Sequence, residues 1–187
     1  MGRIVVTEFV SLDGVMEDPG GAEDFKHGGW SFEISRGDEG DRFKLDETMA
    51  SDALLLGRVT YEGFAKAWPS RDGEFADKFN SMPKYVISST LRSPEWNKTT
   101  VLEVDLADEV AELKEKYTGD IVVHGGARLV QTLLEKDLVD ELRLMVFPLV
   151  LGSGKRLFGE LSDKKRLRLR DSKVVGDGVA ILFYERA

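Results

Sequence analysis

The sequence contains no cysteine and only two histidines among its 187 residues. Without cysteine there is no disulfide framework and no thiolate metal site, and two histidines provide no zinc-binding His/Cys set. We therefore expect a fold held together by its core, with no bound metal, and the lack of cysteine fits a reducing cytoplasm. A chain of this length can bury about two-thirds of its unfolded surface, so we expect a single domain over residues 1–187.

An excess of positive charge is also missing, because 34 acidic residues outnumber 26 basic ones and the net charge is −8. An acidic protein has no general attraction to nucleic acid or to an anionic membrane, so we expect a small-molecule ligand instead. No apolar run approaches the roughly 18 residues of a membrane span, and the first residues lack the apolar region of a signal peptide. These features predict a soluble cytoplasmic protein.

The pattern that is present is a repeated strand followed by a helix. Short apolar runs predict strands at residues 4–10, 53–56, 84–87, 99–104, 121–123 and 141–150. Helical spacing and caps predict helices at residues 38–50, 57–68, 74–80, 105–117 and 127–136. Alternation near residues 166–170 and a turn before residues 179–184 predict a closing antiparallel pair. The fold class is therefore α/β, with a mixed, mainly parallel sheet, and residues 17–31 form a loop able to cover a cleft.

Three predicted strands end in residues that suit a phosphate-rich ligand. These residues are Gly57, Arg58 and Thr60 after the second strand, Ser88, Ser89 and Thr90 after the third, and His124, Gly125 and Gly126 after the fifth. The carboxyl ends of parallel strands share one edge, which is where open α/β sheets bind ligands. Each cluster alone is also typical of a turn or a helix cap. Their coincidence at one edge predicts a dinucleotide or similar ligand.

In this order and spacing, the three motifs resemble those of the dihydrofolate reductase superfamily, over roughly residues 3–185. Phe9-Val-Ser11-Leu-Asp13-Gly14 and the segment from Phe147 to Gly154 are more similar to one branch of it. That branch contains the reductase domain of bifunctional riboflavin-biosynthesis deaminase-reductases and its stand-alone relatives. The resemblance implies a dihydrofolate reductase-like three-layer fold, with helices on both faces of an eight-stranded sheet and NADPH bound across the strand ends.

The resemblance also implies roles for particular residues. The cofactor-binding set is Gly57, Arg58, Thr60, Ser88, Ser89, Thr90, His124, Gly125, Gly126 and Ala127. The substrate-binding set is Ser11, Gly14, Phe147 and Gly152. Dihydrofolate reductases usually have glycine where His124 stands and arginine where Ala127 stands. Here the arginine that could bind a phosphate stands one position later, at Arg128. Arg58 and Arg92 are further candidate cations for a 2′-phosphate.

Two carboxylates are candidate catalytic acids. The spacing of dihydrofolate reductases points to Asp41, although acidic residues at a helix start also favour the helix dipole. The riboflavin branch has Ser-x-Asp-Gly at Asp13, although an Asp-Gly pair also forms turns. The implied reaction is hydride transfer from NADPH to a C=N or C=O bond of a pterin-like, aminopyrimidine-like or other small substrate. The alternative is a non-catalytic nucleotide-binding module of the same fold.

The predicted strand at residues 141–150 is apolar on both faces and contains Pro148. Proline cannot donate to a central ladder, which favours an edge strand, and an apolar edge strand requires a cover. We therefore expect a homodimer through residues 142–151, as the family resemblance also implies. Burial of this strand by the chain's own core is the alternative.

Overall fold

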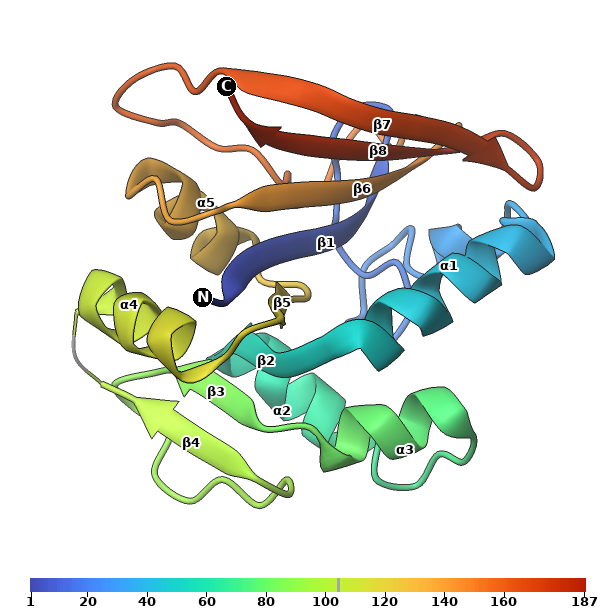
Figure 1. Ribbon diagram of the computed structural model, residues 1–187. Helices are drawn as coiled ribbons and strands as arrows, with labels where there is room; N and C mark the ends of the chain where they lie inside the picture. The colour runs from blue at the N-terminus through green and yellow to red at the C-terminus, as the bar shows by residue number, and fades with distance from the viewer. Residues whose placement is uncertain (104) are drawn as a thin grey trace.

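The computed structural model describes residues 1–103 and 105–187. One eight-stranded sheet runs through the molecule and helices cover both of its faces (Figure 1). The strands are β1 Arg3–Ser11, β2 Ser51–Gly57, β3 Lys84–Ile87, β4 Thr99–Leu102, β5 Asp120–Val123, β6 Glu141–Phe147, β7 Leu167–Val175 and β8 Val179–Arg186. The helices are η1 Trp30–Phe32, α1 Gly37–Ala50, α2 Arg58–Ala67, α3 Glu74–Ser81, α4 Leu106–Lys116 and α5 Ala127–Glu135.

The strand order is β4-β3-β2-β5-β1-β6-β8-β7. The first six strands are parallel, whereas β8 runs antiparallel to both β6 and β7. This topology confirms the predicted dihydrofolate reductase-like architecture, including its antiparallel C-terminal strands. The predicted strand at residues 99–104 is present as β4, and Val104 lies outside the described residues. None of the described helices is long and apolar enough to cross a membrane.

The strands alternate between two cores, as strands covered on both faces must. Ile4 and Val6 of β1 pack in the core shared with α4 and α5, whereas Val5 packs in the core shared with α2 and α3. A third cluster around Trp30 and Phe147 lies under η1, α1 and β8. The sheet is therefore the middle layer of three, and each of its faces is closed by helices from the same chain.

Strand β6 corrects the prediction of an apolar edge strand. It lies between β1 and β8 and pairs with both along its length. Pro148 follows the last residue of the strand, so its missing N–H interrupts no ladder. Leu142, Met145 and Phe147 are buried by the chain's own cores. The prediction of an edge strand is therefore wrong, because β6 is central and covered by the chain's own cores. Val150, beyond the strand, is 69% exposed, and the homodimer through residues 142–151 stays a prediction.

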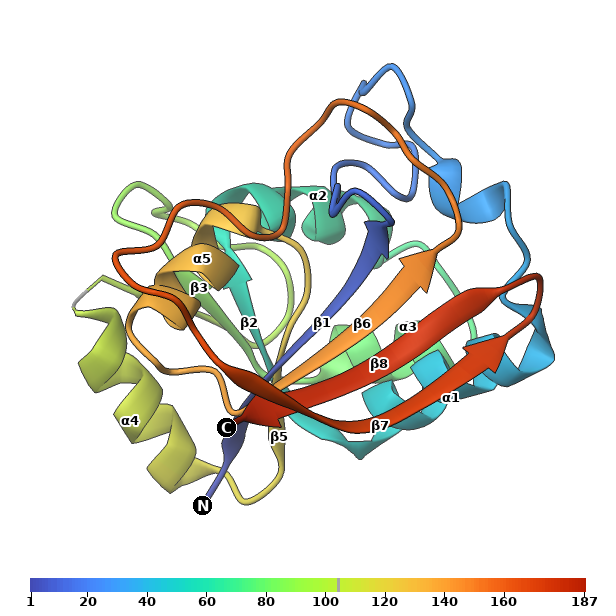
Figure 2. The same ribbon diagram turned by 90° about the horizontal axis from the view of Figure 1, so that it is seen from above.

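Two long connections, one after β1 and one after β6, lie side by side beyond the carboxyl ends of these strands (Figure 2). Met16 donates its backbone N–H to the carbonyl of Lys155 at 2.9 Å, and Val15 forms an antiparallel bridge with Arg156. Leu12 likewise donates to the carbonyl of Leu149 at 2.9 Å. The start of the predicted covering loop is held as well, because Lys155 donates its backbone N–H to the Glu17 carboxylate at 2.8 Å.

Candidate functional site

A cleft of about 390 Å³ opens at the carboxyl edge of the sheet, beside β1 and the end of β5. Strand β5 pairs with β1 only from Arg3 to Val6, whereas β6 pairs with β1 as far as Ser11. From Thr7 onwards β1 thus has a strand neighbour on one side and the cleft on the other. The α-helix that follows β5 is α5 and the α-helix that follows β1 is α1, and these two helices pack on opposite faces of the sheet. The cleft between β1 and β5 therefore lies at a topological switch point, where such sheets bind ligands.

Glycine is required at the turn after β5. Gly125 and Gly126 have φ values of +64° and +77°, which residues with a Cβ rarely adopt. A Cβ on Gly125 would lie only 2.9 Å from the Thr60 side chain. The turns after β2 and β5, which the sequence predicted to share an edge, are therefore in direct contact at the cleft.

Two helices begin at this contact. Helix α2 follows Gly57 and helix α5 follows Gly126, and neither start is capped by a side chain among the described residues. Their first-turn N–H groups and positive dipole ends are therefore free to bind an anion. Ala127 and Arg128 also line the cleft.

The three candidate arginines are placed differently. Arg58 pairs with Glu62 at 3.1 Å and Arg92 pairs with Glu103 at 2.7 Å, and neither residue lines the cleft. Arg128 lines the cleft and has no ion-pair partner in the part of the chain that the structure describes. Of the three candidate arginines, Arg128 is thus the one most available to a ligand in the cleft.

The serine-threonine cluster after β3 is largely occupied in its own turn. The Ser88 hydroxyl accepts hydrogen bonds from the backbone N–H groups of Thr90 and Leu91, at 3.1 and 3.0 Å. Ser89 and Thr90 are exposed at the same sheet edge but do not line the cleft. A ligand extending out of the cleft toward β3 would meet these two residues rather than Ser88.

One wall of the cleft is aromatic. It consists of Phe64 from α2, Trp68 directly after α2, and Phe75 and Phe79 from α3. The rings of Trp68 and Phe75 are stacked with centroids 5.0 Å apart, and His124 meets Phe79 edge to face at 5.4 Å. Such a wall is suited to a flat, largely apolar ring.

The opposite wall carries a buried polar group that the sequence patterns did not reveal. Lys44 of α1 donates to Glu47 at 2.6 Å and to the Thr7 hydroxyl at 2.9 Å. Burial acts to raise the pKa of Glu47, but Lys44 and Arg143 outweigh it and hold that pKa below its ordinary value. Burial and the charge of Lys44 lower the pKa of His124 to about 3, so the imidazole is neutral at pH 7.

Glu8 is the second residue that was missed. Its side chain lines the cleft, yet the residue is only 7% exposed. Burial raises its pKa to about 8, against the opposing effects of the Lys44 charge and the Gly125 backbone N–H. Its buried Oε1 atom has no hydrogen-bond partner among the described residues. Glu8 therefore retains a proton at neutral pH.

The predicted acid Asp13 has a structural role. Its carboxylate accepts hydrogen bonds from the Ser11 hydroxyl at 2.6 Å and from the backbone N–H groups of Leu151 and Gly152 at 3.1 and 2.8 Å. The Ser11 hydroxyl and these N–H groups hold the pKa of Asp13 near 2. Ser11, Asp13 and Gly152 thus join two loops, and none of them lines the cleft.

The other predicted catalytic and substrate-binding residues also lie outside the cleft. The Asp41 side chain is 64% exposed and pairs with Arg36, which counts against it as the acid. Gly14 belongs to the turn after β1, where its φ of +78° requires glycine. Phe147 is fully buried in the core against Trp30, so it cannot contact a substrate.

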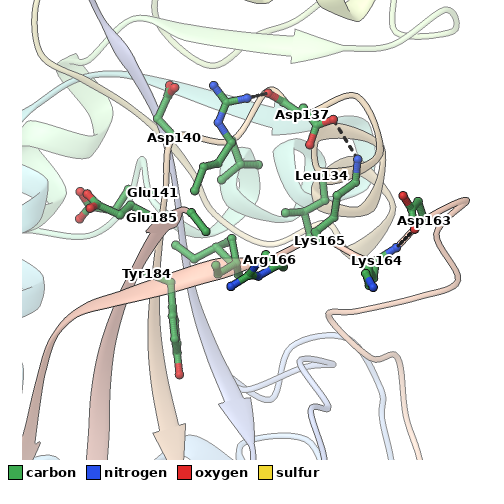
Figure 3. Close-up of a pocket in the computed structure, with 15 residues that line it drawn as sticks. Leu134, Asp137, Asp140, Glu141, Asp163, Lys164, Lys165, Arg166, Tyr184 and Glu185 are labelled. Atoms are coloured by element: carbon green, nitrogen blue, oxygen red, sulfur yellow. Dashed lines mark hydrogen bonds and ion pairs between the residues drawn. The ribbon is translucent and has the colours of Figure 1, made fainter.

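A second hollow, of about 360 Å³, lies at the other end of the sheet (Figure 3). Charged side chains from the ends of β6 and β8 and from the segment before β7 surround it, and several pair with one another, including Lys165 with Asp137 at 2.9 Å. It lies beside the amino end of β6, away from the strand ends that carry the glycine turns. The cleft at the carboxyl edge is therefore the candidate active site.

The sequence and the fold were compared with those of known proteins. The family described as RibD C-terminal domain matches residues 3–181. The uncharacterised protein YyaP of Bacillus subtilis is 30% identical over 187 residues, covering 97% of this chain and 94% of YyaP. A solved structure of a Shewanella sp. PV-4 protein linked to riboflavin biosynthesis has a TM-score of 0.80, 26% identity and 99% coverage of both chains.

A more distant solved structure shares the fold alone. It is dihydrofolate reductase from Enterococcus faecalis, complexed with NADP(H) and RAB-propyl, with a TM-score of 0.61 and 16% identity. The match covers 98% of this chain and 96% of that enzyme. The family match extends over almost the whole chain, as the sequence motifs predicted. The chain therefore belongs to the RibD C-terminal domain family.

Proposed function

We propose that this chain is an NADPH-dependent reductase acting on a C=N or C=O bond of a planar, pterin-like or aminopyrimidine-like ring. Membership of the RibD C-terminal domain family supports an oxidoreductase. The observation that carries the proposal is the cleft itself, in which a glycine turn and two uncapped helix starts face an aromatic wall and a proton-bearing carboxyl group. The glycine turn and helix starts suit the phosphates of a dinucleotide, and the aromatic wall suits a flat acceptor ring beside it.

The residues at the glycine turn fit the cofactor. The absence of a Cβ at Gly125 and Gly126 lets a pyrophosphate approach the first-turn N–H groups of α5. The Arg128 guanidinium can donate two charge-assisted hydrogen bonds to a 2′-phosphate, which NADPH has and NADH lacks. The bound cofactor supplies the hydride. A nicotinamide ring in the cleft would lie along the part of β1 that β5 no longer covers.

The acceptor side favours a ring that carries little negative charge. Trp68 and Phe75 line the cleft and stack on each other, while the covering loop adds the carboxylates of Glu17 and Glu23. Lys44 is already committed to Glu47, so it offers no free charge to an anionic substrate. These features support a planar neutral heterocycle in preference to a phosphorylated one.

Calorimetric titration with NADPH and with NADH tests the cofactor assignment. We expect saturable binding of both, tighter for NADPH, and a loss of this preference in Arg128→Ala. Arg168→Ala is the matched control, because Arg168 lies on β7 and pairs with Glu185, away from the cleft. If neither nucleotide binds, the proposal fails.

A turnover assay separates the reductase from the non-catalytic module. NADPH oxidation is followed with dihydropterins, aminopyrimidines and simple carbonyl compounds as acceptors. The reductase predicts cofactor oxidation matched by reduction of at least one acceptor. Stoichiometric NADPH binding with no oxidation across the panel would favour the nucleotide-binding module.

A further inference from the structure

Glu8 has an unusual position in the sheet. It lies on β1 two residues beyond Val6, the last residue that β5 pairs with, so this side of the strand opens into the cleft. The glycine turn after β5 stands beside it, and the Gly125 backbone N–H is close enough to act on its carboxyl group. Glu8 therefore lies between the expected cofactor cradle and the acceptor side of the cleft.

Within residues 1–103 and 105–187, no cation forms an ion pair with the Glu8 carboxyl group. Lys44 faces it from α1, but the Lys44 ammonium is held by Glu47 at 2.6 Å and by Thr7 at 2.9 Å. His124, directly after β5, lines the same cleft and is neutral at pH 7. The remaining charged groups that line the cleft are Glu17, Glu23, Arg128 and Lys155. A buried carboxylate with an unpartnered oxygen is costly, so these surroundings favour the neutral acid.

We propose that Glu8 is the catalytic acid of this site, donating a proton to the acceptor nitrogen or oxygen as the neighbouring carbon receives hydride. The inference rests on the proposed reductase function. Reduction of a C=N bond needs a hydride at carbon, which NADPH supplies on becoming NADP⁺, and a proton at nitrogen. The π pair of the C=N bond moves to nitrogen, the Glu8 O–H bond breaks and an N–H bond forms. Water then returns a proton to the Glu8 carboxylate.

The other acids and bases at this edge are less suited to the role. Asp13 is ionised and accepts three hydrogen bonds, and Asp41 is exposed outside the cleft. Lys44 is held in an ion pair, and His124 has lost its proton at neutral pH. Glu8 combines a retained proton with a position in the cleft.

Isotope-edited infrared spectroscopy of the full chain tests the protonation directly and needs no substrate. The spectrum of the wild type minus that of Glu8→Gln, both labelled with ¹³C-glutamate, isolates the Glu8 carboxyl group. We expect the carbonyl band of a protonated acid at pH 7, replaced by a carboxylate band above about pH 8. An ionised Glu8 at pH 6 would overturn the proposal.

Single-turnover oxidation of NADPH by dihydrofolate and by 7,8-dihydrobiopterin tests the proton transfer. We expect Glu8→Gln to bind NADPH as the wild type does but to react at least 100-fold more slowly, within the range for loss of a general acid. Glu8→Asp keeps an acid and should recover part of the rate. Glu112→Gln, an exposed change on α4, is the matched control. Wild-type rates and an unchanged pH profile in Glu8→Gln would overturn the proposal.

The two proposals fail in different ways. Absence of NADPH binding by the wild type refutes the reductase function, whereas the infrared titration of Glu8 is measured without cofactor. A chain that binds NADPH normally and holds an ionised Glu8 refutes only the role of this residue.

Discussion

The burial of Glu8 makes the stability of the protein depend on pH. The pKa of Glu8 is raised from 4.5 to about 8 in the folded chain. Between these values the unfolded chain has released the proton and the folded chain still holds it, so the Glu8 contribution is complete below pH 4.5 and is lost as pH rises toward 8. At 1.36 kcal/mol per pH unit, the interval amounts to about 5 kcal/mol. This is a large part of the stability of a typical domain.

Glu8→Gln removes this dependence while keeping the size of the side chain. The free energy of unfolding of both proteins is measured by urea titration between pH 5 and pH 9. We expect the variant to gain on the wild type steadily from pH 5 to pH 8, by about 4 kcal/mol, and the difference to level off above pH 8. The contribution of His124 has the opposite sign but is common to both proteins, so it cancels in the difference. A difference that is flat across this range, as Glu112→Gln should show, would refute the reasoning.

Three further predictions concern the cleft and its loops. Gly125→Ala should lower stability by more than about 1 kcal/mol and abolish NADPH binding, because Gly125 has a positive φ and a Cβ there would meet the Thr60 side chain. Thermal unfolding checks this, with Gly63→Ala as the control, because Gly63 is a helical residue with open space around it. Arg128→Ala should weaken NADPH binding roughly tenfold or more and NADH binding less, by calorimetry. Asp13→Asn should speed hydrogen exchange at the Leu151 and Gly152 amides at pH 7, and this difference should disappear as pH falls below about 2, where the wild-type carboxylate is protonated.

The strand ends were predictable from the sequence because their chemistry is local. Gly57, Thr60, Gly125 and Gly126 each follow a short apolar run, and parallel strands bring such ends to one edge. The structure places the turns after β2 and β5 in contact, as expected. The turn at Ser88 also lies at this edge, although its hydroxyl is used locally.

The polar wall of the cleft was not predictable from periodicity. Apolar spacing in α1 points to Phe43, Leu45 and Met49, but the fully buried face of this helix carries Lys44 and Glu47. Buried polar side chains become evident only when their partners are known, and Thr7 comes from another part of the chain. Glu8 was missed for a similar reason, because almost every residue of β1 is buried and the sequence does not show that Glu8 lines a cleft.

Two expectations depended on the direction of a side chain and on the end of a strand. Asp41 directly follows Gly40 on α1, and a step of one residue turns about 100° around a helix, so its side chain leaves the buried face. Pro148 indicated an edge strand only because the predicted strand extended to residue 150. Strand β6 ends at Phe147, one residue before Pro148, and is central in the sheet.

The most direct test of the account is a crystal structure of the chain grown with NADPH. We expect the pyrophosphate to accept hydrogen bonds from the backbone N–H groups at the start of α5, with the 2′-phosphate within reach of Arg128. The nicotinamide ring should lie in the cleft beside Glu8. A structure in which NADPH binds elsewhere, or crystals that stay free of it at saturating concentration, would contradict the account.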